Sequence, residues 1–253
     1  MRAPTLVLAL CAATTALSAQ SPLGDWPQHS RTRPAPPVVK PGAPALPVPP
    51  PADAVVLFDG TSLANWENGK GEAARWTLVD DKAFEVAPGK GGIQTRAGFG
   101  DVQLHVEWAS PKPAQGKDQD RGNSGVFFMG RYEVQVLDSY ENATYPDGQA
   151  ASIYGQYPPL VNVSRPPGVW QSYDILFRRP RFDAAGKLLK PACFTVFHNG
   201  VMVQDNVEPV GATAHTTRPP YELHPDRLPI SLQDHGHKVR FRNIWLRELE
   251  AKR

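Results

Sequence analysis

Two segments about 100 residues apart each place an amide and an ionisable side chain on one face of an expected strand. In the first segment Glu133 and Gln135 share the face opposite the apolar residues. From Ile230 onward, Gln233 and His235 share a face in the same way. Successive side chains of a strand point to opposite faces of a sheet. If both segments belong to one sheet, they form a polar surface with a carboxylate and an imidazole, a combination suited to general acid–base chemistry.

The same pattern also fits a sheet with one solvated face, where such polar residues are ordinary. Five further polar residues could have structural roles instead of functional ones. Asp138 and Asp234 could end strands, cap turns or orient a histidine. His198 precedes an Asn-Gly turn, and Asn123 could simply lie in a turn. Arg242 could bind a hydroxyl-rich ligand or pair with a carboxylate.

Other kinds of site lack their usual sequence patterns. There is no His-x-x-x-His, no cysteine pair and no acidic calcium loop, and the His-x-His at 235–237 is by itself weak evidence for a metal. Neither the Gly-x-Ser-x-Gly elbow of serine hydrolases nor a phosphate-binding loop occurs. With 27 Lys and Arg against 25 Asp and Glu, the net charge of +2 gives no reason to expect a nucleic acid or an anionic membrane as partner.

Short alternating segments dominate most of the chain. Residues 102–108 alternate with four apolar side chains on one face, and residues 132–137 and 173–177 alternate again. At 194–203 two such segments flank an Asn-Gly pair, which is typical of a two-residue hairpin turn. No window of a dozen residues shows a convincing amphipathic helix. The sequence therefore predicts an all-β domain over residues 53–250, built as a two-sheet sandwich or jelly roll.

Two long stretches, 139–168 and 206–229, do not fit strands. Loops of more than ~15 residues in a compact domain are usually functional or disordered. The first stretch contains several tyrosines and prolines. We therefore expect it to form an ordered rim or lid over one face of a sheet.

The N-terminus has the features of a secretory signal peptide over residues 1–19, namely one basic residue, a short apolar run and a small-residue end. An uncleaved anchor is the alternative, and the mature chain has no predicted membrane span. Residues 20–52 are a Pro-rich linker, with eleven prolines among residues 22–51. Because proline removes backbone donors and fixes φ, we expect an extended spacer, either a dispensable leader or a tether to the cell envelope. The sequence thus predicts an exported protein, periplasmic or extracellular.

Eight strings, in order along the chain, resemble the bacterial 3-keto-disaccharide hydrolase-like domain family, also described as 3-keto-glucoside 1,2-lyases and 3-keto-2-hydroxy-glucal hydratases. They are VLFDG at 56–60, GNSGV at 122–126, YEVQVLD at 132–138, IYGQ at 153–156, PPG at 166–168, HNGV at 198–201, LQDHG at 232–236 and VRFRNI at 239–244. The resemblance covers roughly residues 53–249, and the Pro-rich segment lies outside it. It implies a concanavalin A-like lectin/glucanase jelly roll, exported by bacteria.

The resemblance also implies a carbohydrate substrate, a glycoside already oxidised to a ketone at sugar carbon 3. That ketone acidifies the hydrogen on carbon 2, a base removes it, and the aglycone leaves from carbon 1 by β-elimination. Water can then add to the glucal product, so the net result is hydrolysis without an oxocarbenium ion. Ordinary glycosidases instead place two carboxylates across the bond.

Under this hypothesis the polar residues receive roles. Glu133 is the expected base, and His235 is the expected acid, which protonates the leaving oxygen or polarises the ketone. Asp138 is the third expected catalytic residue, which orients or replaces one of the other groups. A divalent metal ion on this polar surface could stabilise the enolate, although the sequence shows no site for one. The residues expected to contact the sugar or the enolate oxygen are Asn123, Gln135, Tyr154, His198, Gln233, Asp234 and Arg242.

Two other classes of function stay open. This fold serves lectins as readily as enzymes, so the chain could be a non-catalytic sugar-binding module. It could also be a structural or interaction domain displayed on a stalk, in which case Glu133 and His235 would not share a pocket. The enzyme hypothesis predicts that both groups converge on one cavity, and their placement on opposite sheets would refute these roles.

Overall fold

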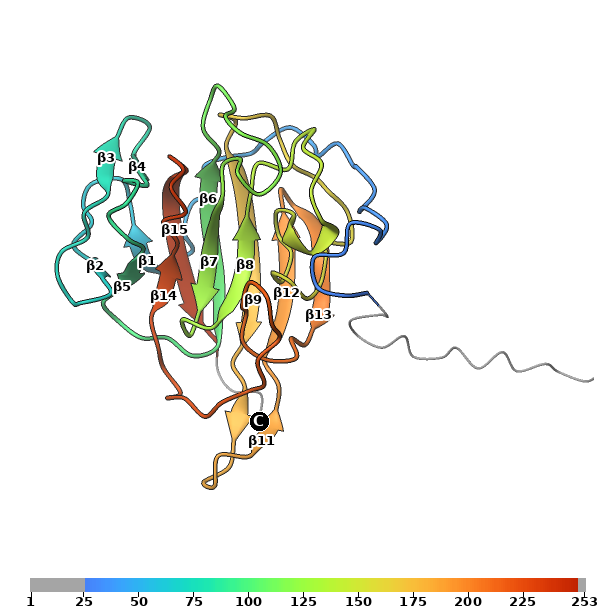
Figure 1. Ribbon diagram of the computed structural model, residues 1–253. Helices are drawn as coiled ribbons and strands as arrows, with labels where there is room; N and C mark the ends of the chain where they lie inside the picture. Colours follow the sequence, from blue (N-terminus) through green and yellow to red (C-terminus); the bar gives the residue numbers. More distant parts are fainter. Residues whose placement is uncertain (1–25, 250–253) are drawn as a thin grey trace, which may run out of the picture.

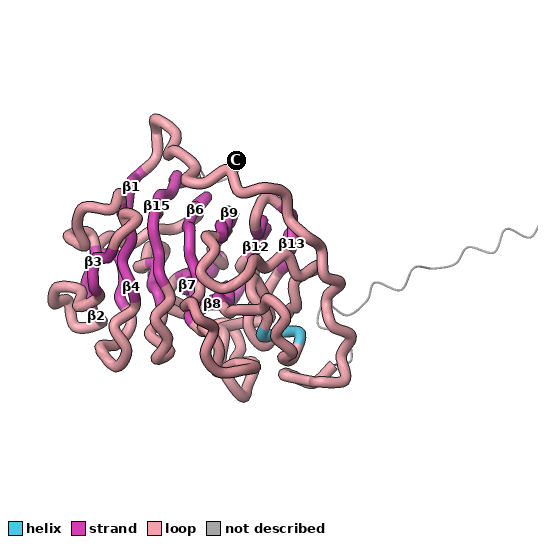
Figure 2. The backbone as a smooth tube through the Cα atoms, turned by 90° about the horizontal axis from the view of Figure 1, so that it is seen from above, coloured by secondary structure: helices cyan, strands magenta, loops and turns pink. Residues whose placement is uncertain are grey.

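The computed structural model describes residues 26–249, which form an all-β, concanavalin A-like jelly-roll sandwich of two antiparallel sheets (Figures 1 and 2). The one helical segment among these residues is a 3₁₀ turn, η1 (Pro146–Gly148), so none of their helices is long and apolar enough to span a bilayer. The predicted fold class is confirmed. The predicted signal peptide lies outside the described residues.

The larger sheet has eight strands, and Figure 2 shows its central strands side by side, with β7 and β8 of the smaller sheet below them in the view. The hydrogen-bonded order of the larger sheet is β13 (Val201–Val207), β12 (Cys193–His198), β9 (Gln171–Arg178), β6 (Val102–Ala109), β15 (Arg240–Glu248), β4 (Ala83–Glu85) and β3 (Thr77–Val79), with β1 (Val55–Phe58) also paired to β15. The order of the smaller sheet is β2 (Trp66–Asn68), β5 (Ile93–Thr95), β14 (Ile230–Leu232), β7 (Ser124–Phe128) and β8 (Tyr132–Val136). A separate two-stranded ribbon joins β10 (Arg181–Phe182) to β11 (Leu188–Lys190).

The core lies between the two sheets and follows the predicted alternation. The alternate residues of β6 and β8 that belong to it are Val102, Leu104, Val106, Trp108, Tyr132, Val134 and Val136. Rings from opposite sheets meet there, and the centroids of Phe128 and Phe177 are 4.7 Å apart. Because side chains alternate along β8, Glu133 and Gln135 lie on the face of the smaller sheet that points away from this core.

The two long stretches fold against β8. In stretch 139–168, the carbonyl of Ser152 accepts a hydrogen bond from Gln135 N at 3.0 Å. In the other stretch, Thr213 N donates to Arg131 O at 2.7 Å, just before the strand begins. Both stretches are therefore ordered, and together they form a rim around the face that carries the predicted base.

The described part of the Pro-rich segment, residues 26–52, lies against the domain (blue in Figure 1). Val39 N donates to Asn162 O at 2.9 Å, and the carbonyl of Val48 accepts a hydrogen bond from Asn243 Nδ2 at 2.7 Å. We call residues 28–48 the strap. Between these anchor points the segment follows the surface of the domain instead of standing away from it as a free spacer would.

Candidate active site

A cavity of about 250 Å³ opens on the outward face of the smaller sheet. Its lining residues are Asn123, Phe127, Glu133, Gln135, Tyr154, Thr213, Ala214, His215, Gln233 and His235. Six of them are residues that the sequence predicts for the site, namely Asn123, Glu133, Gln135, Tyr154, Gln233 and His235. Glu133 and His235 thus line one cavity on one sheet, the arrangement that the enzyme hypothesis requires.

The strand register explains why residues distant in sequence meet here. On β7 and β8, Phe127 lies opposite Glu133 and Gly125 lies opposite Gln135. Beyond the end of β14, Gln233 N donates to Gly125 O at 3.0 Å, which extends the same row across three strands. Cross-strand neighbours present their side chains on the same face of a sheet. The two polar stripes therefore form one surface.

Glu133 is a buried carboxyl group, with 5% of its surface exposed. Among residues 26–249, no hydrogen-bond donor contacts its carboxylate oxygens. The one hydrogen bond that Glu133 makes to another side chain is donated by its backbone amide. Gly125 leaves the space that the carboxylate occupies, since a Cβ there would lie 2.4 Å from Glu133 Oε1. Burial without a compensating partner raises the pKa of Glu133 to about 8. Once ionised, this group is a strong base for a carboxylate.

Two amide oxygens beside the carboxyl group are also buried and unpaired within the described part of the chain, Gln135 Oε1 and Gln233 Oε1. The Gln135 side chain is fixed, because its Nε2 donates to Gln119 Oε1 at 3.1 Å. Asn123 is held by the same residue, with Nδ2 donating to Gln119 O at 2.8 Å. Buried acceptors without partners are uncommon in folded proteins. A ligand rich in hydroxyl groups would supply the missing donors.

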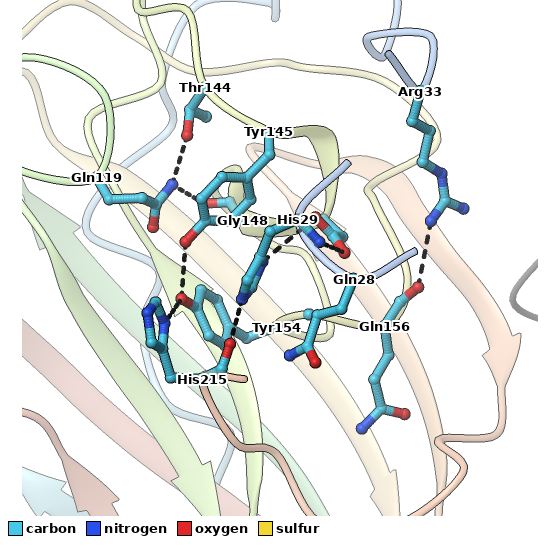
Figure 3. Close-up of polar contacts among 12 residues, drawn as sticks. Gln28, His29, Arg33, Gln119, Thr144, Tyr145, Gly148, Tyr154, Gln156 and His215 are labelled. Atoms are coloured by element: carbon cyan, nitrogen blue, oxygen red, sulfur yellow. Dashed lines mark hydrogen bonds and ion pairs between the residues drawn. The ribbon is translucent and has the colours of Figure 1, made fainter. Parts of the chain in front are cut away.

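Tyr154 and His215 form another part of the wall, and Tyr145 lies next to Tyr154 outside the lining (Figure 3). Tyr154 OH lies 2.7 Å from Tyr145 OH and 3.1 Å from His215 Nδ1. Burial raises the pKa of Tyr154, and the charge of ionised Glu133 raises it further. The Tyr154 phenol therefore keeps its proton at neutral pH. It can donate that proton into the pocket when Tyr145 OH and the Nδ1–H tautomer of His215 both donate to its oxygen.

His235 lines the pocket but is itself exposed. Its ring stacks on that of His237, with centroids 5.9 Å apart. His237 Nε2 in turn lies 3.2 Å from Asp120 Oδ1. An exposed imidazole exchanges protons freely with water, which suits a group that must be reprotonated in each turnover.

Four predicted site residues lie outside the pocket, and two of them are aspartates with structural partners. Asp138 is buried in an ion pair with Arg121 Nε at 2.9 Å. Asp234 accepts hydrogen bonds from Gly91 N and Gly236 N, each at 2.9 Å, and so fixes a turn. These contacts argue against the predicted catalytic role of Asp138 and the predicted substrate contact of Asp234, because neither residue lines the pocket and their oxygens are engaged elsewhere.

The other two residues belong to the larger sheet. His198 is 1% exposed, its Nε2 lies 2.9 Å from Gln171 Oε1, and burial lowers its pKa to about 3. It is therefore a neutral residue of the interior. Arg242 Nε donates to Glu107 Oε2 at 2.8 Å. The predicted sugar contacts of His198 and Arg242 are wrong for this pocket, because their strands are in the opposite sheet.

The sequence gives no prediction for four lining residues, Phe127, Thr213, Ala214 and His215. Thr213, Ala214 and His215 belong to the stretch 206–229. The one feature of this stretch that suggests a function from sequence is its length. An irregular loop has no periodicity that would assign its side chains to a face. The stretch nevertheless reaches the predicted base, since Glu133 N donates to Thr213 Oγ1 at 3.1 Å.

Among residues 26–249, no group of three or more His, Cys, Asp or Glu side chains is arranged to hold a metal ion. The pocket combines one carboxyl group with two imidazoles, His215 and His235, but these do not form a ligand cluster. The divalent ion stays a prediction, and no step is assigned to it.

A family model described as the 3-keto-alpha-glucoside-1,2-lyase-like domain matches residues 53–247. The chain belongs to this family. All ten lining residues of the pocket fall within the matched part, and the strap precedes it. Membership in the 3-keto-alpha-glucoside-1,2-lyase-like family supports a role in carbohydrate processing.

Solved structures agree with the family assignment. A Parabacteroides distasonis protein described as a "putative glycosyl hydrolase" is 45% identical, with a TM-score of 0.76, and the similarity covers 85% of this chain and 93% of that one. A second P. distasonis protein with the same description is 18% identical, covers 78% of this chain and 94% of its own, and has a TM-score of 0.56, which shows the fold alone. No curated protein matches the chain.

Proposed function

We propose that the protein cleaves 3-keto-glycosides by removing the proton on sugar carbon 2 and expelling the aglycone from carbon 1. The observation that carries this proposal is the carboxyl group of the pocket. Glu133 is the one carboxylate among the described lining residues, and burial raises its pKa to about 8. Ordinary glycosidases need two carboxyl groups across the bond, whereas elimination beside a ketone needs one strong base. Family membership supports the same chemistry.

Each step balances without a redox partner. Ionised Glu133 takes the proton from carbon 2, and the electron pair of that bond forms an enolate whose oxygen is the former ketone oxygen. When the enolate collapses, the ketone returns, a double bond forms between carbons 1 and 2, and the bond from carbon 1 to the leaving oxygen breaks. The leaving oxygen takes a proton from an acid. Addition of water to the product gives the free 3-keto sugar.

The remaining polar groups divide the other tasks. His235 protonates the leaving oxygen, because it lines the pocket and stays in exchange with solvent. Tyr154, whose hydroxyl group lies 3.1 Å from His215 Nδ1, donates a hydrogen bond to the ketone oxygen, where negative charge develops. The unpaired oxygens of Gln135 and Gln233 accept hydrogen bonds from sugar hydroxyl groups.

The test is incubation of the purified protein with a 3-keto-glucoside and, separately, with the parent glucoside, using both anomers. We expect release of the aglycone from the keto sugar alone, transient 2-hydroxy-3-keto-glucal, and a slower reaction when carbon 2 carries deuterium. Comparable release from the parent glucoside would overturn the proposal, because that substrate has no acidic hydrogen on carbon 2. The matched control is Glu133→Gln, which keeps the shape of the side chain and removes the base.

Two further experiments test the role of a metal ion and the alternative of a non-catalytic sugar-binding module. Addition of EDTA tests the divalent ion: lost release that is restored by added metal would assign one, and unchanged release would leave the chemistry to the side chains. Binding of the keto sugar without release, with equal affinity in the Glu133→Gln variant, would favour a sugar-binding module instead.

A further inference from the structure

The beginning of the strap reaches the wall of the pocket from outside the family-matched residues (Figure 3). Gln28 Nε2 donates to Ala214 O at 2.7 Å, and His29 Nε2 donates to His215 O at 2.5 Å. Ala214 and His215 both line the pocket. Two consecutive strap residues thus hold the backbone of two consecutive pocket residues.

His29 is itself fixed by the other part of the rim. Its ring centroid lies 4.1 Å from that of Tyr145, and its backbone amide donates to Asp147 Oδ2 at 3.0 Å. Gln28 is equally confined, because a Cβ on Gly155 would lie 2.2 Å from Gln28 Nε2. The strap therefore bridges the stretches 139–168 and 206–229, which meet the pocket from different parts of the sequence.

The strap also meets both ends of a hydrogen-bonded chain that reaches the pocket wall at Tyr154 and His215. Tyr145 OH lies 2.7 Å from Tyr154 OH, which lies 3.1 Å from His215 Nδ1. The His29 ring packs at a tilt of 41° against the ring of Tyr145, and it donates a hydrogen bond to the backbone of His215. A shift of His29 would therefore move both ends of the chain that presents the Tyr154 hydroxyl group to the pocket.

Few other contacts fix this part of the wall. Among the described residues, the one further hydrogen bond of Ala214 or His215 is that from the His215 ring to Tyr154. Thr213, one residue earlier, is anchored independently, through its amide to Arg131 O at 2.7 Å. The hydrogen bonds from the strap therefore fix the backbone immediately after Thr213.

We propose that Gln28 and His29 are positioning residues of the active site, which hold the backbone of Ala214 and His215 so that the His215 ring and Tyr154 face the substrate. Neither strap residue lines the pocket, so neither contacts the sugar. The kinetic part of this inference rests on the proposed function, and its structural part does not.

The kinetic test uses the full chain with a 3-keto-glucoside as substrate. His29→Phe keeps a ring on Tyr145 and removes the donor to His215 O, so we expect KM to rise about tenfold and the pH profile to stay unchanged. We expect kcat to fall as well, because a displaced Tyr154 stabilises the developing enolate less well. His29→Gln, which keeps a donor, should recover most of the affinity. Arg33→Ala is the matched control, since Arg33 donates to Gln156 O at 3.4 Å and lies outside the pocket, and its KM should stay within twofold.

Hydrogen–deuterium exchange provides a readout that needs no turnover. In the double variant Gln28→Ala/His29→Phe, amides of residues 211–217 should exchange faster while those of both sheets keep their wild-type protection. Faster exchange across both sheets without a local excess would overturn the proposal, because the strap would then stabilise only the fold as a whole. Local loosening with an unchanged KM would also overturn it. If the protein releases no aglycone, the proposed function fails, and the exchange result alone decides the role of the strap.

Discussion

Glu107 and Glu133 are two buried carboxyl groups in the same domain, one on each sheet. Glu107 lies on β6 with 0% exposure, and Glu133 lies on β8 with 5% exposure. Each alternates with core residues and so occupies the face of its sheet that points away from the core. Their sequence patterns are alike, but their surroundings are not.

Glu107 is surrounded by donors. Val48 N and Asn243 Nδ2 donate to its Oε1 at 2.9 and 2.8 Å, and Arg242 Nε donates to its Oε2 at 2.8 Å. His105 Nε2 also lies 3.5 Å from Oε1. Burial opposes ionisation of Glu107, but these hydrogen bonds outweigh it and hold its pKa below the ordinary value.

The contrast shows that burial alone does not identify a functional carboxyl group. A buried charge with a full set of donors is structural, and its loss leaves its partners uncompensated. A buried carboxyl group without donors, beside other unpaired polar atoms in a cavity, is the better candidate for chemistry. The strap contributes to both regions, through Val48 at one and through His29 at the other.

Replacement of Glu133 by Gln should have the largest effect on activity. Loss of a general base typically costs ~10²–10⁴-fold, so we expect kcat/KM on a 3-keto-glucoside to fall about 10³-fold while the fold is retained. Steady-state kinetics and thermal unfolding check this, with Glu107→Gln as the matched variant on the other sheet. A fall of less than tenfold would contradict the assigned role.

Replacement of Glu107 by Gln should instead lower stability and leave activity nearly unchanged. A neutral amide has one oxygen, so it cannot accept from Arg242 on one side and from Val48 and Asn243 on the other. We expect the free energy of unfolding to fall by about 3 kcal/mol, the range for breaking a buried ion pair. Urea unfolding measures this, and kcat/KM per folded molecule should stay within threefold. Equal stability of variant and wild type would remove the distinction between the two carboxyl groups.

Gly125→Ala tests whether the position of the Glu133 carboxylate matters. The new Cβ would lie 2.4 Å from Glu133 Oε1 and 2.9 Å from Phe127 Cε2, so the carboxylate must move. A displacement of about 1 Å can cost ~10²-fold in rate, and we expect kcat to fall between about 10- and 100-fold. Gly69→Ala is the control, because a Cβ there meets nothing within 4 Å. Equal rates for the two variants would show that the carboxylate needs no defined position.

The pH dependence of the rate should show the smallest of these effects. Burial raises the pKa of Glu133 to about 8, so its ionised fraction rises about tenfold between pH 7 and pH 9. We expect kcat/KM to rise by about the same factor over this range. A flat profile measured with a 3-keto-glucoside would argue against Glu133 as the base.

Stability should respond to pH in opposite directions at the two sites. The contribution of Glu133 is fully present below its unfolded pKa near 4.5 and is lost as pH rises through about 8. The contribution of Glu107, whose pKa is lowered, is present above 4.5 and is lost as pH falls through its folded pKa. Urea unfolding across pH should therefore show that Glu133→Gln removes a loss of stability between about pH 4.5 and pH 8 and that Glu107→Gln removes a loss below about pH 4.5. If the free energy of unfolding of the two variants had the same pH dependence, the predicted difference between Glu133 and Glu107 would be wrong.

Local patterns predict much of the fold. The alternation at 102–108 corresponds to β6, and the Asn-Gly pair forms the turn between β12 and β13, where Asn199 and Gly200 have φ of 52° and 79°. These features follow from side-chain alternation and from the conformational freedom of Asn and Gly, which are properties of adjacent residues. The packed course of the strap is not predictable in this way, because its partners lie far along the chain.

The candidate site is predictable only where it stands on strands. Glu133 and Gln135 follow from alternation along β8, whereas Gln233 and His235 lie beyond the end of β14 and line the pocket from the segment that follows it. Alternation places His198 on the buried face of β12 with Phe194 and Val196, but it does not show which sheet that strand joins. His215 lies on a loop, and no local rule assigns it to the pocket.

The sequence by itself determined which side chains share a face, because the two-residue period of a strand is local. It could not distinguish Glu107 from Glu133, since both alternate with apolar residues. The tertiary structure decided between them by bringing Val48 from 59 positions away and Arg242 from 135 positions away to Glu107. At Glu133 the same folding brought rim loops, amides and Gly125 but no donor to the carboxylate. Hydrogen-bond partners and desolvation depend on distant segments, and these two quantities set whether a buried carboxyl group is held as a charge or stays protonated near neutral pH.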